Sequence, residues 1–285
     1  MVKKLWIFDN KGPESQETSK RLHELIQSLG RDRTDSISAV GSALSDDYFE
    51  LDEENPEIVI SIGGDGTMLS AFHRYEAQVE KIRFVGVHTG HLGFYTDFLA
   101  NELLEFINAL QNESPERAVR YPLLSVAIKF HNGDEKLYHA LNEATIRRGS
   151  ETLVAEVDIS DFLFEKFRGD GLVVSTPTGS TAYNKSIGGA VMDPRVEAMQ
   201  VAEIASINNR VFRTLGSAMI VAKKDKIRIR PEENIDLLLT IDQNEFDLSN
   251  IEEVVFSLDG QTIAFANCAH TPFWERVKNS FIGIS

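Results

Sequence analysis

The stretch that decides the fold of the amino-terminal part is "PEIVISIGGDGTMLSAFHRY", residues 56–75. Its apolar run at 58–62 predicts a buried β-strand that ends at Gly63 and Gly64. Thr67 stands where it can cap a helix beginning near Met68. A strand followed at once by a helix is typical of α/β folds with a parallel sheet, and ligands bind at such turns along the carboxyl edge of the sheet.

Asp65 is the residue of this turn that needs an explanation. Glycines let the backbone approach a phosphate and a helix start favours an anion, so a carboxylate is not expected in a loop that only binds phosphate. Neither standard nucleotide fingerprint is present, because no Lys-Ser/Thr pair follows a Walker-type loop and "GDGTML" lacks the third glycine of the dinucleotide motif. Two interpretations remain open: Asp65 forms an Asx-turn, or it is a general base for attack of a hydroxyl on a phosphoryl group.

The segments around this stretch continue the alternation of strands and helices. "KLWIF" at 4–8 and "RFVGVH" at 83–88 are predicted strands, and "ESQETSKRLHELIQSLG" at 14–30 is a predicted helix. Another helix is predicted at 100–112, with an apolar stripe formed by Leu103, Leu104, Ile107 and Leu110. This order predicts a parallel sheet with crossover helices.

After Pro115 the chain has the texture of an all-β protein. Short strand-like runs separated by turn signals occur at 121–130, 135–148, 153–160, 162–176, 226–231, 236–242, 252–260 and 262–268. One helix is predicted inside this part, at 196–209, and a short amphipathic helix at 271–283 is expected to pack its apolar face on an earlier segment. We therefore expect a domain boundary near residue 118.

The charge of the whole chain narrows the classes of partner. A formal net charge of -15 and a pI near 4.9 argue against a nucleic-acid-binding or anionic-membrane-binding surface. The most basic segment, "AKKDKIRIRP" at 222–231, alternates charged and apolar residues, which indicates a strand with one solvated face. Small anionic ligands remain possible where a local site supplies donors.

Length, cysteine content and apolar segments exclude further classes. The 285 residues, 42% of them hydrophobic, suggest one large or two medium domains. Cys268 is the only cysteine, so an intrachain disulfide and a thiolate metal cluster are excluded, and a buried inert thiol is the better interpretation. The apolar run near the start is too short for a signal peptide, and no run of about 18 apolar residues follows, so we expect a cytoplasmic protein without membrane partners.

Two further clusters carry polar side chains that could bind a ligand. Asn142 and Glu143 lie next to a predicted strand, where a solvated edge and a polar cleft are both consistent with the sequence. Residues 167–190, "FRGDGLVVSTPTGSTAYNKSIGGA", are rich in Gly, Ser and Thr, as in a turn-rich loop or a nucleotide pocket. In the second case Tyr183 would stack on a base, and the segment's Arg and Lys side chains would supply cations for phosphate.

These motifs together resemble the NAD kinase family, especially its shorter bacterial members. The resemblance rests on "GGDGT" at 63–67, "NE" at 142–143 and "GDGLVVSTPTGSTAY" at 169–183, in this order and spacing. "HTGHLGFYTD" at 88–97 and "ASINNRVFRTLGS" at 205–217 are similar as well, so the likeness spans most of the chain and thins before about residue 50. GGDGT also occurs in diacylglycerol and sphingosine-type lipid kinases, and phosphofructokinases have a related loop, so the Thr/Ser-rich third motif decides the choice.

The resemblance implies an amino-terminal Rossmann-like α/β domain, a β-sandwich-like second domain and a carboxyl-terminal helix that returns to the first. The implied limits are 1–118 with 270–285 for the α/β domain and 119–269 for the β-rich domain, with NAD between them. By the same resemblance the chain forms a homotetramer or homodimer, in which the segment that includes 196–217 lies near a subunit contact and lends a residue to the neighbouring NAD site.

The resemblance also assigns roles to residues. Asp65 would remove the proton from the 2′-hydroxyl of the adenosine ribose of NAD, so that ATP or polyphosphate phosphorylates it to give NADP, with Mg²⁺ arriving on ATP. Gly66 would lie beside the substrate, and Phe94 would form one wall of the adenosine site. Asn142 and Glu143 would bind adenine and ribose. The remaining residues implied in the NAD pocket are Arg168, Asp170, Thr178, Thr181, Ala182, Tyr183, Asn184, Lys185 and Ser186.

The sequence departs from the family at two places, and two rival functions remain. His73 stands where the family often has Arg or Lys, and "AYNKSIGGA" at 182–190 replaces a commoner apolar run, which leaves donor details and the roles of Asn184 and Lys185 open. For His88 and His91 there are two interpretations, a pair of metal ligands or structural hydrogen bonds. Their three-residue spacing without a third ligand favours hydrogen bonds. The rivals are a lipid kinase of the GGDGT type and a non-catalytic NAD(P)-binding sensor. Donor preference, NADH acceptance, inhibition by NADP and oligomer size do not follow from the sequence.

Overall fold

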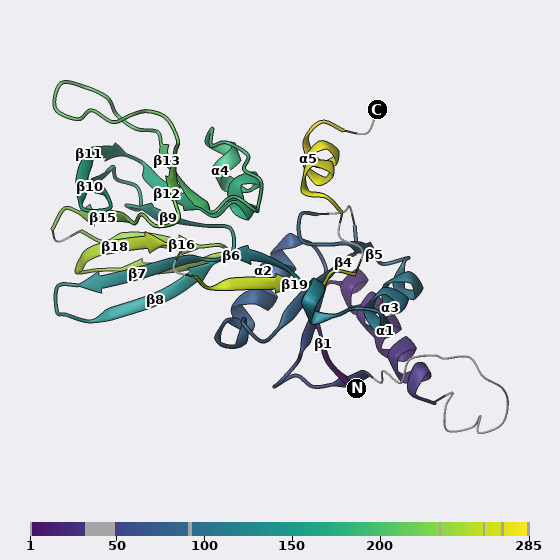
Figure 1. The fold of residues 1–285 in the computed structure, drawn as a ribbon. Helices are drawn as coiled ribbons and strands as arrows, with labels where there is room; N and C mark the ends of the chain where they lie inside the picture. The colour runs from purple at the N-terminus through teal and green to yellow at the C-terminus, as the bar shows by residue number, and fades with distance from the viewer. Residues whose placement is uncertain are drawn as a thin grey trace. The chain divides into compact units, whose positions relative to one another are not determined.

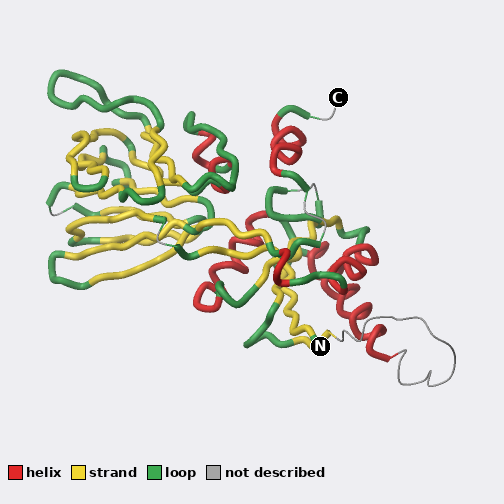
Figure 2. Tube along the Cα trace, viewed as in Figure 1, coloured by secondary structure: helices red, strands yellow, loops and turns green. Residues whose placement is uncertain are grey.

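The computed structural model describes residues 2–31, 49–90, 93–233, 235–258, 260–268 and 271–283. It divides into two compact units, here called unit 1 (residues 1–120 with 263–285) and unit 2 (residues 121–262). Figure 1 shows the order of the elements along the chain, and Figure 2 separates the helix-containing and strand-rich parts by colour.

Unit 1 is built on a sheet whose strands follow the order β2-β1-β3-β4-β19-β6, with β5 beside β4. The pairings of β1 with β2 and β3, of β3 with β4, and of β4 with β5 and β19 are parallel. The strands are β1 (Lys3–Asp9), β2 (Phe49–Leu51), β3 (Ile58–Ile62), β4 (Arg83–His88), β5 (Phe98–Leu99), β6 (Val119–Pro122) and β19 (Thr262–Phe265). The predicted parallel α/β architecture is confirmed.

Helices cover both faces of this sheet. These helices are α1 (Pro13–Arg31), α2 (Asp65–Arg74) and α3 (Leu103–Gln111), with 3₁₀ turns η1 (Glu76–Gln78) and η2 (Pro115–Arg117); α5 (Phe273–Phe281) follows near the end of the chain and is largely exposed. Leu22 of α1 and Phe106 of α3 share one buried cluster with Ile60 of β3, so these two helices pack on the same face. Figure 1 shows α2 on the other side of the sheet. The turn from β3 into α2 therefore opens at the carboxyl edge of the central parallel strands.

Unit 2 is a sandwich of two antiparallel sheets. Their strand orders are β11-β10-β15-β18-β7-β8 and β14-β13-β12-β9-β16-β17. The strands are β7 (Leu124–Phe130), β8 (Glu135–Ala140), β9 (Glu143–Arg147), β10 (Leu153–Ile159), β11 (Phe162–Gly169), β12 (Gly171–Ser175), β13 (Ala198–Ile204), β14 (Met219–Ala222), β15 (Ile227–Pro231), β16 (Leu237–Ile241), β17 (Asn244–Leu248) and β18 (Ile251–Ser257). A 3₁₀ turn η3 (Thr178–Thr181) and the short helix α4 (Tyr183–Ser186) follow β12.

The core of unit 2 draws inward-facing side chains from both sheets. Val126 of β7 and Phe256 of β18 lie in one buried cluster with Ile146 of β9 and Val174 of β12. Aligned sandwiches fill their interior in this way, because alternate residues of each strand point to the partner sheet. The predicted β-sandwich-like second domain is confirmed.

The basic segment behaves as a strand with a solvated face, as its sequence predicts. Ile227 and Ile229 are fully buried in the core, whereas Arg230 pairs with Asp158 at 3.0 Å and Arg228 with Glu253 at 3.0 Å. These two arginines are therefore matched by carboxylates of their own sheet. Among the described residues, no helix is long and apolar enough to cross a membrane.

One predicted element is wrong, and one predicted strand joins a different sheet from the one expected. Residues 198–204, inside the helix expected at 196–209, form β13, which lies between β12 and β14 and is buried along nearly its whole length. The strand at 262–265, grouped above with the β-rich part, is β19 and pairs in parallel with β4 of unit 1. In both cases pairing with a distant strand decides where the segment belongs, and local composition does not show that pairing.

Smaller corrections concern the helices. Leu104, assigned to the apolar stripe of α3, is 66% exposed, and Phe106 is buried in its place. The helix after the GGDGT turn begins at Asp65, so Thr67 lies inside its first turn and is not its cap. Cys268 is only half-buried. Burial nevertheless raises the pKa of its thiol to about 12, so the thiol stays protonated at neutral pH.

Candidate functional site

The GGDGT turn joins β3 to α2 through a backbone that requires glycine. Gly63 has φ +149, and a Cβ there would lie 2.2 Å from Oγ1 of Thr67. Gly64 is the N-cap of α2 and makes no side-chain cap bond, so the first helical N–H groups point into the turn. Asp65 is the first residue of the helix, where the helix dipole stabilises a negative charge.

The carboxylate of Asp65 is held by the loop that follows β4. The backbone N–H of Phe94 donates to Oδ2 at 2.9 Å, and that of Tyr95 donates to Oδ1 at 2.9 Å. These bonds run to residues about thirty positions away, so the Asx-turn, a bond to the residue's own turn, does not account for this side chain. Each oxygen accepts one N–H and keeps a lone pair for a further donor. The half-buried carboxylate is oriented and still able to accept a proton.

The aromatic ring of Phe94 packs against the carboxyl-terminal helix. Its ring centroid lies 6.2 Å from that of Phe273 and 5.8 Å from that of Phe281, both on α5. The expectation that this helix packs its apolar face on an earlier segment is confirmed, and the segment is the loop that holds Asp65.

In unit 2 the Asn142–Glu143 pair stands at the turn from β8 into β9. The carboxylate of Asp242, in the hairpin between β16 and β17, accepts the backbone N–H groups of Leu141 at 2.9 Å, Asn142 at 2.7 Å and Glu143 at 3.3 Å. Asp242 itself has φ 52 and donates its N–H to the carbonyl of Glu143 at 2.9 Å. One carboxylate thus fixes the backbone of the whole turn, which is a buried turn and not a solvated edge.

Glu143 is a buried carboxyl group with an altered charge state. Its burial, and next the nearby carboxylate of Asp242, raise its pKa from 4.5 to about 8, against a hydrogen bond from the N–H of Tyr183. Its Oε2 is buried and has no hydrogen-bond partner among the described residues. A protonated carboxyl group at this position can both donate and accept a hydrogen bond.

The start of the Thr/Ser-rich segment packs directly on this turn. Thr176 Oγ1 donates to the carbonyl of Leu141 at 2.6 Å, and Thr178 Oγ1 does so at 3.1 Å. Gly179 lies so close that a Cβ would be 2.0 Å from the carbonyl oxygen of Asn142. The structure therefore brings together Asn142, Glu143, Thr178, Thr181 and Tyr183, the last of which is 38% exposed.

The other predicted pocket residues of unit 2 have different surroundings. Asn184 is fully buried and donates to the carbonyls of Ser180 at 3.4 Å and Ala190 at 3.5 Å, so its side chain holds the fold of the segment. The guanidinium of Arg168 lies 5.3 Å from the ring centre of Phe212. Asp170, Lys185 and Ser186 are exposed, and Ala182 is half-buried.

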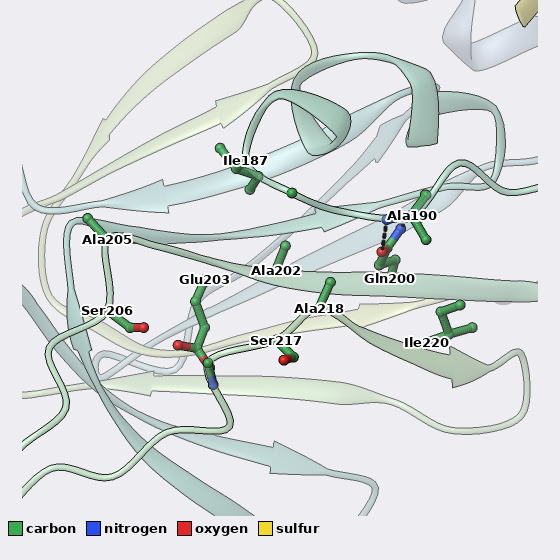
Figure 3. Close-up of a pocket in the computed structure, with 12 residues that line it drawn as sticks. Ile187, Ala190, Gln200, Ala202, Glu203, Ala205, Ser206, Ser217, Ala218 and Ile220 are labelled. Carbon is green, nitrogen blue, oxygen red and sulfur yellow. Dashed lines mark hydrogen bonds between the residues drawn. The ribbon is translucent and has the colours of Figure 1, made fainter.

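A separate pocket of about 580 Å³ lies beside β13 in unit 2. Figure 3 shows small residues such as Ala202 and Ala218 along its wall, with the side chain of Gln200 accepting the N–H of Ala190 at 2.8 Å. Glu203 accepts the N–H of Gly216 at 3.0 Å and so holds the loop that closes one side. None of the pocket's lining residues is Asn142, Glu143 or Tyr183.

The histidines do not assemble a metal site among the residues described. His88 Nδ1 accepts the N–H of Gly90 at 2.6 Å, as expected for a structural hydrogen bond, while His91 lies outside the described residues. In the described part of the chain, no three His, Cys, Asp or Glu side chains are grouped as ligands would be.

Comparison with protein families gives matches on both units. The model of the ATP-NAD kinase N-terminal domain matches residues 9–114, and that of the ATP-NAD kinase C-terminal domain matches residues 141–259. The chain belongs to the NAD kinase family. An NAD kinase of Lactococcus lactis (strain IL1403) is 56% identical over 281 residues, covering 99% of this chain and 97% of that protein. An NAD kinase of Streptococcus pneumoniae (strain 70585) is 50% identical over 282 residues, covering 99% and 97%.

Solved NAD kinase structures share the fold. The crystal structure of yeast NADH kinase complexed with NADH superimposes with a TM-score of 0.76 at 20% identity, covering all of this chain and 88% of that one. An NAD kinase from Archaeoglobus fulgidus in complex with ATP gives a TM-score of 0.69 at 21% identity, covering 99% and 100%. At such identities the similarity shows the fold alone.

Two residues that organise the site were missed by sequence reasoning. Asp242 stands in "LLLTIDQNEF", where an Asp between two apolar runs indicates only a hairpin turn. Arg276 of α5 stands in the segment 271–283, for which the sequence predicts only an amphipathic helix; it is 4% exposed and bonds to the loop beside Asp65. An Arg inside a helix gives no local signal of burial, so only the structure reveals it.

Proposed function

We propose that this chain phosphorylates the 2′-hydroxyl of the adenosine ribose of NAD, with ATP or polyphosphate as donor, to give NADP. The observation that carries the proposal is the carboxylate of Asp65, fixed at the carboxyl edge of a parallel sheet in a chain of the NAD kinase family. The close relatives over the whole chain length are NAD kinases, which agrees with this activity and gives the rival functions no support.

In the proposed reaction Asp65 acts as general base. Its carboxylate accepts the 2′-hydroxyl proton while the ribose oxygen attacks the γ-phosphorus of ATP, and the bond from phosphorus to the bridging oxygen of ADP breaks. The two backbone N–H groups hold the carboxylate in one orientation, so no reorganisation is needed when the hydroxyl arrives. Gly66 has no side chain to obstruct the substrate beside it. Mg²⁺, which we expect to enter bound to ATP, would neutralise charge on the phosphates.

Unit 2 would supply the groups that recognise the nucleoside. The turn of Asn142 and Glu143 offers an amide and a carboxyl group as hydrogen-bond partners for adenine and ribose, and the exposed ring of Tyr183 offers a stacking surface. Phe94 of unit 1 would contact the adenosine. The remaining residues proposed to line the pocket are Arg168, Asp170, Thr178, Thr181, Ala182, Asn184, Lys185 and Ser186.

We further propose a cytoplasmic homodimer or homotetramer. The resemblance of 205–217 to the family supports the assembly, as do the exposed apolar side chains in this part of unit 2: Val211 is 78% exposed, Leu215 55% and Ile220 57%. The acidic surface supports small-molecule substrates over nucleic acid or membrane lipid.

A substrate panel tests the proposed function. Purified protein is incubated with Mg²⁺ and ATP, or with polyphosphate, and with NAD, diacylglycerol or fructose 6-phosphate as acceptor. We expect NADP from NAD, read with an NADP-specific dehydrogenase, and no phosphorylation of the other two. A folded sample that binds NAD but forms no NADP with either donor would favour the non-catalytic sensor, and phosphorylation of diacylglycerol would favour the lipid kinase.

A further inference from the structure

Arg276 is a buried cation on a helix that is otherwise largely exposed. It is 4% exposed and is the one buried residue of α5 among those described, whereas Trp274 is 53% and Phe281 43% exposed. A guanidinium is rarely buried unless its donors are matched. The question is therefore what those donors hold.

Three of the four hydrogen bonds that this guanidinium makes with described residues go to the loop that follows β4. Nη1 donates to the carbonyl oxygens of Gly93 at 2.9 Å and Thr96 at 2.6 Å, and Nη2 pairs with the carboxylate of Asp97. Nε donates to the carbonyl of Thr271, just before the helix, at 3.1 Å. The planar, five-donor fork of Arg suits these four partners, and an ammonium group cannot reproduce its geometry.

The same loop presents the two N–H groups that hold Asp65. The carbonyl of Gly93 and the N–H of Phe94 belong to one peptide group, which is planar, so fixing the direction of the carbonyl fixes the direction of the N–H. Arg276 thus donates to one end of this peptide at 2.9 Å, and the other end donates to Asp65 Oδ2 at 2.9 Å. Hydrogen bonds in such a chain strengthen one another.

The loop packs tightly against the carboxylate of Asp65. A Cβ on Gly93 would lie 2.3 Å from Asp65 Oδ1, so the loop and the carboxylate are in close contact. The N–H of Gly93 also bonds to Thr96 Oγ1 at 2.9 Å, which closes residues 93–96 into a compact turn. A rotation of this turn would carry both N–H donors away from Asp65.

We propose that Arg276 is a positioning residue for the phosphoryl transfer, acting through the peptide groups of residues 93–97 to keep Asp65 aligned with the hydroxyl that it deprotonates. The proposal rests on the catalytic role assigned to Asp65 above. It gives the carboxyl-terminal helix a part in catalysis in addition to its packing against Phe94. A purely structural role, in which Arg276 only compensates the buried charge of Asp97, is the alternative.

A double-mutant cycle in the full-length protein separates the two roles. The variants are Arg276→Lys, Asp65→Asn and their combination, with Lys278→Met on the exposed side of the same helix as control. NADP formation from NAD and Mg²⁺·ATP gives kcat and the KM for NAD, and thermal unfolding shows that each variant is folded at the assay temperature. If Arg276 acts through Asp65, its loss matters only while Asp65 can act.

We expect Arg276→Lys to lower kcat by about 10- to 100-fold, the range for a misplaced catalytic group, and to change the KM for NAD much less. In the Asp65→Asn background the same substitution should lower kcat by less than about twofold. Lys278→Met should leave both constants unchanged. An unchanged kcat for Arg276→Lys, or an equal loss in both backgrounds, would overturn the proposal.

A second variant is measured in case Arg276→Lys does not fold. Arg276→Gln carries no charge but still donates N–H bonds to carbonyl oxygens, and the same cycle is then measured with it. If neither variant folds, Arg276 serves folding and the positioning role is wrong. Failure of the proposed function is distinct, because it would show as a folded wild-type protein that makes no NADP, or as an Asp65→Asn variant with undiminished kcat.

Discussion

Glu143 shows how one residue of the site is set by its surroundings. In water a glutamate is ionised at neutral pH, but here burial and the carboxylate of Asp242 hold the pKa of Glu143 at about 8. The folded protein therefore keeps a proton that the unfolded chain releases above its usual 4.5. Because the folded state binds more protons between these values, stability falls as pH rises from about 4.5 to about 8.

Replacing Glu143 with Gln removes this pH dependence. We expect the wild-type protein without ligand to lose free energy of unfolding between pH 5 and pH 9 relative to Glu143→Gln, by at most about 4 kcal/mol, since about three pH units separate pH 5 from the pKa of about 8 at 1.36 kcal/mol each. Urea denaturation of both proteins at several pH values measures the difference. Parallel curves across this range would show that Glu143 is already ionised in the folded protein.

The candidate residues differ in how far sequence could locate them. Asp65, Asn142 and Glu143 stand in short motifs whose order along the chain identified them as candidate site residues. The structure adds the hydrogen-bond partners that hold them. The resemblance to the NAD kinase family implied that Asn184 lines the pocket, but its side chain is fully buried. Burial of an amide depends on contacts with Ser180 and Ala190, which composition does not encode.

Among the elements, the β16–β17 hairpin is the support of the Asn142–Glu143 turn. Its Asp242 accepts three backbone N–H groups, and a residue with φ 52 must tolerate the left-handed region, as Asp and Asn do. A charged acceptor of several donors contributes more than a neutral one. The hairpin thus fixes a turn about a hundred residues earlier in the chain.

Asp242→Asn tests this support with the backbone conformation preserved. The amide nitrogen replaces one acceptor oxygen and faces an N–H donor, so we expect a loss of about 1–3 kcal/mol in the free energy of unfolding. Loss of the negative charge should also lower the pKa of Glu143 from about 8. Asp247→Asn, on the exposed side of β17, is the matched control and should change stability by less than about 0.5 kcal/mol. Equal effects of the two substitutions would remove Asp242 from this role.

Strand β13 marks the limit of prediction for elements. Its sequence, "AMQVAEI", contains strong helix formers such as Ala, Met, Gln and Glu, and it lacks the alternation of a strand with one buried face. A strand between two others and buried on both faces need not alternate. The parallel strands β1, β3 and β4 were predicted correctly because their apolar runs are bounded by turn residues and helical patterns.

For the whole molecule, the sequence was sufficient for the two architectures but not for the way the chain returns to unit 1. The α/β order and the later run of short strands predict a parallel sheet and an all-β part, and the resemblance to the NAD kinase family implies the β-sandwich. The return of β19 to β4, and the bond from Arg276 to Gly93 across 183 positions, are long-range pairings with no local signal. Both bring the end of the chain to the sheet that carries Asp65.

The central proposal for the whole molecule is the phosphorylation of NAD with Asp65 as general base. The substitution Asp65→Asn tests it most directly. Asn keeps the size of Asp and retains one acceptor oxygen for the loop, but it cannot take the hydroxyl proton. Measurements of kcat with NAD and Mg²⁺·ATP, and of the dissociation constant of NAD, are made on variant and wild type, with circular dichroism to confirm folding. We predict a fall in kcat of about 10²- to 10⁴-fold, or roughly 3 to 5 kcal/mol of barrier, with NAD affinity changed much less. A folded variant with near-normal kcat would contradict the account and remove Asp65 from the mechanism.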